Sequence, residues 1–570
     1  MTPTSDGETP TGPIPAGEPL PASVTRSIGR SGAIVASGTL VSRILGFVNA
    51  LLLYNTIGTV GQSADAFALA NQLPNNIYAI IAGGTLTAVI VPAIVRASGH
   101  ADGGERFLNK LVTLGITIFA TITIAVTVAA PLVVQLYAQT GGDGSRGFAD
   151  AQVALTIAFA YWCLPQVFFY AVFAILSEVL NARGVFWPYA WAPVINNLVF
   201  ATVLLIFRGV FGSVAESTAG DWTPGMIVLL AGGATLGIVI QSLVLVVAWR
   251  MARIRFRLDF RFKGVGLGRF GQLASWTFAT VLIGQAAGIV ESNVVSLATG
   301  DASIATMSLA WLIFILPYSL VTLSIAIPYF TRMSNHASKG DIPALGADLT
   351  AALKSVLLLQ AYACIAIAVL SPWIASLFSS TPSGRAWVAI VLICYLLGLI
   401  PQSMYGVLLR GWYSVEDTRT PFFLQLGQVL GYVAMLLVIA TFPSDLIAIF
   451  SALALSIAVL VQVAVNLAIM KRRIPTIRVG HIMGRLGWYI GSMIPAALLG
   501  AATVWGLRET GIGAFPDGTW LGSLTTVLVG GIVMAGGYFG MLALTRNPEL
   551  RVVTDIVARR VKRSRSDETE

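Results

Sequence analysis

Apolar stretches of about 20 residues, separated by short polar segments, follow one another along the chain. A helix of that length crosses the hydrocarbon core of a membrane, which is about 30 Å thick. Each stretch therefore predicts one transmembrane helix, and the whole pattern predicts an all-α polytopic membrane protein. Fourteen such stretches begin near residues 32, 64, 107, 150, 184, 225, 270, 303, 350, 385, 421, 443, 483 and 519.

The composition agrees with this pattern. Of the 570 residues, 56% are hydrophobic and 11% are charged, whereas a soluble protein carries about 25% charged residues. A soluble globular protein is therefore excluded. Residues 1–30 are rich in Pro, Gly, Ser and Thr, which predicts a disordered tail rather than a signal peptide. The three cysteines and three histidines occur singly. Because they form no metal-ligand or catalytic grouping, we expect no enzymatic activity and no cofactor.

The net charge of +9 reflects the placement of basic residues. If the N-terminus lies in the cytoplasm, nearly all 35 lysines and arginines fall on that side. This positive-inside pattern predicts cytoplasmic N- and C-termini and requires no nucleic-acid partner. The basic runs at 250–264 and 471–478 are best explained by orientation alone, and contact with anionic membrane lipids is the alternative. The opposite side receives only Arg146, Arg208, Arg385 and Arg508.

Two pairs of loop motifs indicate an internal repeat. Pro92 and Arg96 end the second stretch, and Pro328 and Arg332 end the eighth with the same spacing. The connections at 180–188 and 408–421 each end on a proline. In both pairs the second copy follows the first at nearly the same offset along the chain. Two agreeing offsets predict duplication of a six-helix unit, with both copies in the same orientation because six is even.

The repeat divides the chain into two lobes that face each other. Proline inside several stretches predicts kinked helices, which suits lobes that move. The predicted parts are a cytoplasmic tail (1–30), an N-terminal lobe with helices 1–6 (31–264), a C-terminal lobe with helices 7–12 (265–480), helices 13 and 14 (481–545) and a basic cytoplasmic tail (546–570).

One arginine interrupts the first apolar stretch. Arg43 lies about eleven residues, or 16 Å, into the predicted helix, near the middle of the membrane. An arginine at that depth costs about 2.5–3.5 kcal/mol on insertion scales, so its charge needs a partner. Three arrangements are open: the side chain reaches the cytoplasmic surface, it pairs with Glu291 in the seventh stretch, or it lines a hydrated cavity and meets an anionic substrate.

The neighbours of Arg43 favour the cavity. Gly38, Ser42 and Gly46 recur every four residues, and Asn49 extends this strip of small or polar side chains. Small residues at that spacing allow a second helix to approach closely. Because Arg43 lies beside the strip, we expect its side chain to point toward other helices rather than lipid.

The second stretch contains an acid and several amides. Asp65 lies at its outer end and is either a functional acid or a helix cap. Asn71, Asn75 and Asn76 follow on the same helix. Amides at membrane depth line a cavity or bond another helix more often than they face lipid.

These segments resemble the MviN/MurJ family of lipid II flippases. The resemblance rests on SRILGFVNALLLYNTIG with ADAFALANQLPN and IVPAIVRAS, on LNARGVFWPYAWAPVINN, on LLRGWYSVEDTRTP and on PYFTRMS, and it covers residues 31–545. It implies the multidrug/oligosaccharidyl-lipid/polysaccharide exporter fold with fourteen helices. It also implies transfer of the undecaprenyl-diphosphate-linked peptidoglycan precursor to the outer leaflet of the bacterial plasma membrane. Partners would be that lipid, membrane lipids and other cell-wall or division proteins.

The family's site residues are only partly present. Arg43, Asp65 and Asn75 match a cavity arginine, the acid of the second helix and the asparagine of the LPN motif. Asn49-Ala50 stands where the family often has Arg-Asp, and Leu312 stands where the eighth helix often carries an arginine. These losses leave three explanations open: fewer charges suffice, the substrate differs, or transport has been lost.

From these residues we expect transport by alternating access. Arg43 would pair with the diphosphate, Glu291 would balance Arg43 in the empty state, and Asn49, Asp65 and Asn75 would complete the substrate-binding site. A flippase for another polyprenyl-linked glycan, a drug or cation antiporter of the same fold, and a transport-inactive scaffold for cell-wall assembly are the alternatives.

Overall fold

The computed structural model describes residues 22–550 except 83–104, 142–145, 253, 255, 262–267, 299 and 510–519. Within that part the protein is helical, as predicted. The first part of the chain forms α1 (Ala22–Ile57), α2 (Gln62–Ala82), α4 (Glu105–Val128), α5 (Ala130–Tyr137), α6 (Asp150–Cys163), α7 (Gln166–Ala182), α8 (Trp187–Phe211), η1 (Ala219–Asp221), α9 (Pro224–Ile227), η2 (Val228–Gly232) and α10 (Gly233–Met251).

The second part of the chain is also helical. It forms α11 (Gly268–Val295), η3 (Ser296–Ala298), α12 (Ile304–Pro317), η4 (Tyr318–Thr322), α13 (Leu323–Ser338), α14 (Ile342–Phe378), α15 (Pro382–Leu396), α16 (Leu399–Ser414), α17 (Arg419–Ile439), α18 (Ser444–Arg473), α19 (Val479–Glu509) and α20 (Trp520–Leu544). α1 begins at Ala22, inside the segment predicted as a disordered tail, while residues 1–21 lie outside the described part.

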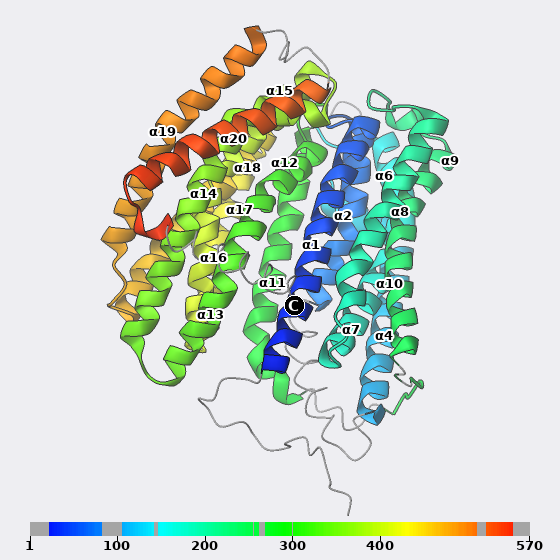
Figure 1. Cartoon of the computed structure of the whole chain (residues 1–570). Coiled ribbons are helices and arrows are strands. Elements are labelled where there is room, and N and C mark those ends of the chain that lie inside the picture. Colours follow the sequence, from blue (N-terminus) through cyan, green and yellow to red (C-terminus); the bar gives the residue numbers. More distant parts are fainter. Residues whose placement is uncertain are drawn as a thin grey trace, which may run out of the picture.

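The helices pack in two groups, visible side by side in Figure 1. We call α1–α10 the N-terminal lobe and α11–α18 the C-terminal lobe, because most helix contacts stay within each group. α19 and α20 pack on each other and on α14, at the edge of the C-terminal lobe. Contacts between the lobes join α1 to α14, α2 to α11 and α12, and α5 to α11.

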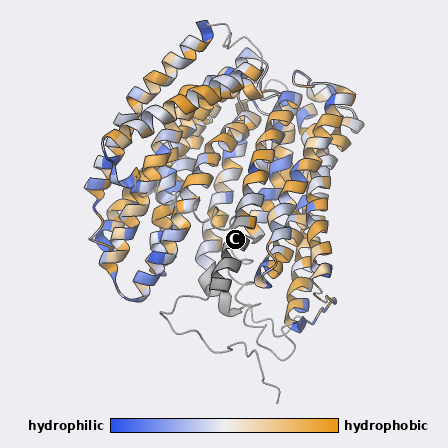
Figure 2. Ribbon diagram, in the orientation of Figure 1, coloured by the Kyte–Doolittle hydropathy of each residue, from blue (hydrophilic) through white to orange (hydrophobic). Residues whose placement is uncertain are grey.

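The outward surface of the helices is apolar. Large hydrophobic side chains such as Val128, Leu205 and Leu498 are more than half exposed, and Figure 2 shows hydrophobic residues along the length of the helices. Such a surface is stable only against lipid. Twelve described helices are long and apolar enough to cross a membrane, and the bent pair α15–α16 would be a thirteenth. The count of fourteen stays a prediction, because α2 is not among them and the rest of its predicted span lies outside the described residues.

The helix boundaries repeat with the offset that the loops predicted. α6 ends at Cys163 and α7 begins at Gln166, whereas α15 ends at Leu396 and α16 begins at Leu399. The second break follows the first at the same offset that separates the two proline-ended connections. Each break lies at or near a proline, Pro165 and Pro401, as expected for kinked helices. The prolines and arginines of the other motif pair cannot be compared, since residues 92 and 96 lie outside the described part.

A π-helical turn interrupts the eighth membrane segment. η4 follows Pro317, which has no backbone N–H to donate to the α-helical ladder. The wider turn separates α12 from α13 and carries Tyr318 and Ser319. Short π segments are rare and are often found at functional sites.

Candidate functional site between the two lobes

Arg43 reaches across the boundary between the lobes. Its half-buried guanidinium on α1 donates from Nη1 to the hydroxyl of Ser319 in η4, and Ser319 donates in turn to the backbone oxygen of Leu316. The predicted depth of Arg43, near the middle of the membrane, stays a prediction. The orientation toward other helices is as predicted.

A second arginine lies near the same π turn, on a helix of the C-terminal lobe. Arg410 on α16 donates to the backbone oxygen of Gly406 at 2.8 Å, and Gly406 packs against the ring of Tyr318. Among the described residues, neither Arg43 nor Arg410 has a carboxylate within ion-pair distance. Two cations without an ion-pair partner in the described part of the chain thus lie near η4, one from each lobe.

The small-residue strip packs α1 against α8, as predicted for a close helix contact. The side chain of Asn197 on α8 donates to the backbone oxygen of Ser42 at 2.8 Å, and the amide of Asn49 donates to the backbone oxygen of Asn197 at 3.0 Å. Asn49 is buried in this contact. Its amide therefore joins two helices of one lobe in this conformation.

We expect Gly38→Ala to destabilise the protein. A Cβ at Gly38 would lie 2.5 Å from the backbone oxygen of Ala190, which cannot move without shifting α8. Overpacking of this kind costs about 1–3 kcal/mol. Gly46→Ala in the same helix is the matched control, because the nearest atom to its Cβ would be 4.0 Å away. Thermal unfolding in detergent should show a lower midpoint for Gly38→Ala only, and equal midpoints would contradict this packing.

Asp65 caps a helix of the other lobe. Its carboxylate is fully buried, and Oδ1 accepts a hydrogen bond from the backbone N–H of Ala305, in the first turn of α12, at 2.8 Å. Asp65 thus accepts from one of the backbone amides at the N-terminus of α12 that have no partner within the helix. As predicted, Asp65 lies in the first turn of α2, but the backbone amide that it caps belongs to α12.

Neighbouring bonds hold the lobes together at the same end of the molecule. Thr306 donates to the backbone oxygen of Thr59 at 2.7 Å, and Thr59 donates to Ser379 at 3.1 Å. We call Thr59, Asp65, Ala305, Thr306 and Ser379 the outer clamp, because the charge pattern predicts that this end faces away from the cytoplasm. These hydrogen bonds join the two lobes at that end.

Asn75 and Glu291 occupy different surroundings. Asn75 follows Pro74 within α2, and its side chain is exposed. Glu291 on α11 lies beside the hydroxyl groups of Tyr395 and Tyr432, within the C-terminal lobe. The structure therefore does not bring Glu291 to Arg43, whose partner is Ser319. The sequence pattern identifies an acid and a base within apolar stretches. It does not show whether the helix faces that carry them meet in the fold.

Several partners were not predicted from the sequence. Ser319 lies hundreds of residues from Arg43, and Asn197 lies on another helix than Asn49. A serine or asparagine in an apolar stretch gives only a weak signal. The sequence offers one signal that the backbone amide of Ala305 lies at a helix start. Ser303, a typical N-cap residue, stands just before α12. Among the described residues no group of His, Cys, Asp or Glu is arranged to hold a metal ion.

Comparison with known proteins decides the family. The family described as "Lipid II flippase MurJ" matches residues 55–515, which is most of the chain. The chain belongs to the lipid II flippase MurJ family. A relative from Vibrio cholerae, "Probable lipid II flippase MurJ", is 24% identical over 85% of this chain and 90% of its own length. The resemblance noted from the sequence motifs is thereby confirmed.

Solved structures that are similar to this chain share its fold. "Lipid II flippase MurJ, inward closed conformation" has a TM-score of 0.67 at 20% identity and covers 90% of this chain and 100% of that chain. A structure described as an inward-facing multidrug resistance MATE family transporter of the MOP superfamily has a TM-score of 0.62 at 17% identity, covering 78% and 98%. The chain is therefore a multi-pass protein of the bacterial inner membrane, from a family of transporters rather than enzymes.

Proposed function

We propose that this chain moves lipid II, the undecaprenyl-diphosphate-linked peptidoglycan precursor, from the cytoplasmic to the outer leaflet by alternating access. The observation that carries the proposal is the position of Arg43, a half-buried cation at the lobe boundary whose partner is a neutral hydroxyl. A guanidinium held by a hydroxyl can exchange that bond for phosphate oxygens, which bind it more strongly.

The diphosphate needs such a partner because its charge cannot enter hydrocarbon unshielded. Arg43 and Arg410 lie near η4 on opposite lobes and together supply two cations. This arrangement supports the explanation that fewer charges suffice, since Arg410 adds a cation near the turn that follows Leu312. The exposed amide of Asn75 adds a polar group on α2, as expected for a residue that lines the route of a headgroup.

In this proposal the outer clamp holds the lobes together in the state that is closed toward the outside. With Asp65 bonded to Ala305 and Thr59 bonded to Thr306 and Ser379, the lobes are joined at the predicted outer end. In this proposal Arg43 receives the substrate from the cytoplasmic side. Separation of these contacts, together with the bond from Arg43 to Ser319, would let the lobes rock and release the headgroup outside. We assign cytoplasmic positions to both termini from the charge pattern.

Transport by the native chain can be tested directly. In vesicles that contain the purified protein and fluorescent lipid II, we expect the labelled headgroup to become accessible to a quencher on the opposite side, faster than in protein-free vesicles. Depletion in the source bacterium should cause lipid-linked precursor to accumulate before lysis. Normal precursor flux after depletion, together with unchanged accessibility in vesicles, would contradict the proposal and favour a scaffold.

A further inference from the structure

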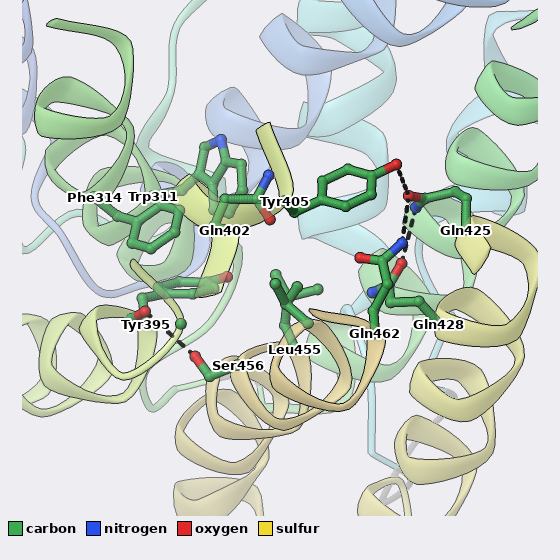
Figure 3. A pocket seen from close by; sticks show the side chains of 12 residues that line it. Trp311, Phe314, Tyr395, Gln402, Tyr405, Gln425, Gln428, Leu455, Ser456 and Gln462 are labelled. Atoms are coloured by element: carbon green, nitrogen blue, oxygen red, sulfur yellow. Dashed lines mark hydrogen bonds between the residues drawn. The ribbon is translucent and has the colours of Figure 1, made fainter. Parts of the chain in front are cut away.

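A cavity of about 190 Å³ lies inside the C-terminal lobe, near the π turn. α12, α15, α16, α17 and α18 contribute its walls, and Figure 3 shows its lining. The volume corresponds to about six water molecules, which is enough for one monosaccharide. The twelve described residues that line it include none with a charge: Trp311, Phe314, Tyr395, Gly398, Gln402, Tyr405, Gln425, Gln428, Leu455, Ser456, Val459 and Gln462.

One wall of the cavity consists of amides. Gln425 accepts hydrogen bonds from the hydroxyl of Tyr405 at 3.1 Å and from the amide of Gln462 at 3.2 Å, and it donates to Gln428 at 2.8 Å. Figure 3 shows this network on one side of the cavity. Glutamine amides inside a membrane-spanning lobe are costly to bury, so a network of them suggests a ligand or a structural need.

Gln402 is the amide that the network leaves out. No described residue makes a hydrogen bond with its side chain, although it lines the cavity beside Trp311 and Tyr405. An amide offers two donor hydrogens and one acceptor oxygen. Gln402 is therefore equipped to bond hydroxyl or acetamido groups of a ligand without losing any contact within the protein.

The other wall is aromatic. The rings of Trp311 and Phe314 stack with centroids 4.9 Å apart, and Tyr395 meets the edge of Trp311 at 5.7 Å. Trp311 is 38% exposed, so neighbouring residues cover its ring only in part. Aromatic faces suit the apolar C–H face of a pyranose, while amides suit its hydroxyl groups. This lining provides no counter-charge for a phosphate.

We infer that this cavity binds an uncharged sugar of the lipid-linked substrate, an inference that rests on the proposed function. Gln402, Gly406 and Arg410 lie on one face of α16 at spacings of four residues, so about 12 Å of helix separates Gln402 from Arg410. A diphosphate near Arg410 and Arg43 would then place the sugar attached to it at the cavity. The charged and uncharged parts of the headgroup would thus meet separate residues.

The test compares two lipids that share the diphosphate. Binding of lipid II and of undecaprenyl diphosphate, which has no sugar, is measured on the full-length protein in nanodiscs. For Gln402→Leu and Trp311→Leu we expect lipid II to bind about tenfold more weakly, because hydrogen bonds or ring contacts to the sugar are lost. Binding of undecaprenyl diphosphate should change less than twofold. Trp311→Phe should retain most of the affinity for lipid II.

Controls separate this inference from the proposed function. Gln135→Leu, at an exposed glutamine on α5, should change neither affinity, whereas Arg43→Ala should weaken both lipids. Equal weakening of both lipids by Gln402→Leu would show a structural role, and no weakening of either would show a cavity that holds only water. Both outcomes overturn the sugar site and leave the proposed function standing. Failure of the native protein to bind either lipid would instead count against the proposed function.

Discussion

Arg43→Ala is expected to reduce lipid II flipping in proteoliposomes by about thirtyfold or more, while the protein still folds and inserts. Removal of a charged partner from a desolvated ion contact costs about 2–5 kcal/mol, and each 1.4 kcal/mol is a factor of ten. The resting state loses only a bond to the hydroxyl of Ser319, so folding should be little affected. The measurement is the initial rate of headgroup translocation at equal protein content.

Three variants make this prediction specific. Arg43→Lys should be partly active, since an ammonium attracts phosphate but cannot form the bidentate contact of a guanidinium. Ser319→Ala should remain active, because Ser319 holds Arg43 only while the substrate is absent. Arg208→Ala, which removes an exposed arginine from the far end of α8, should behave as the native protein. Native activity of Arg43→Ala would refute the assignment.

Asp65→Ala is expected to weaken the closed outer end and slow transport. The substitution removes a hydrogen bond to the backbone of α12 and leaves a buried amide without its acceptor. Such losses are worth about 1–3 kcal/mol together, or a shift of about 5- to 100-fold in the equilibrium between closed and open clamp. Transport requires both states, so the rate should fall when one is depleted.

A disulfide reporter can measure this shift. Thr59 and Ser379 approach within 3.1 Å across the clamp, so Thr59→Cys with Ser379→Cys, in a background without the native cysteines, should cross-link on mild oxidation. We expect slower cross-linking when Asp65→Ala is added. Asp221→Asn is the control. The carboxylate of Asp221 accepts hydrogen bonds from Thr218 in its own loop, which lower the pKa of Asp221, and these bonds are not part of the outer clamp. Unchanged cross-linking in Asp65→Ala would show that Asp65 does not stabilise closure.

Much of the architecture was predictable because lipid imposes simple requirements. Every predicted stretch coincides with a helix of the structure, and the offset between the proline-ended connections recurs between the α6–α7 break and the α15–α16 break. Hydrophobicity and proline act locally, so a sequence pattern records them directly. The number of membrane crossings was less secure, because the amides and Asp65 make α2 less apolar than its neighbours.

The candidate site was predictable only in part. Arg43 was identified because a cation in an apolar stretch is costly wherever its partner lies. Its partner Ser319 is 276 residues away and depends on how the lobes meet, which no local pattern encodes. Glu291 was expected beside Arg43 because an acid in an apolar stretch also needs a partner. In the structure Tyr395 and Tyr432 lie beside Glu291 instead. The glutamines of the C-terminal cavity stand in apolar stretches, and that is the signal by which the cavity could have been found.

The hydrogen bond between Asp65 and α12 restricts substitution at one of its two ends more than at the other. Its donor is a main-chain amide, so the hydrogen bond requires no particular side chain at residue 305, and the need for an acceptor falls on Asp65 alone. Proline is the exception: it removes the N–H, and it is accepted in the first turn of a helix. Ala305 itself is fully buried, so the packing around it still excludes larger side chains. Natural variants of this chain should therefore hold one acid on α2, and at position 305 they should exchange only small residues other than proline.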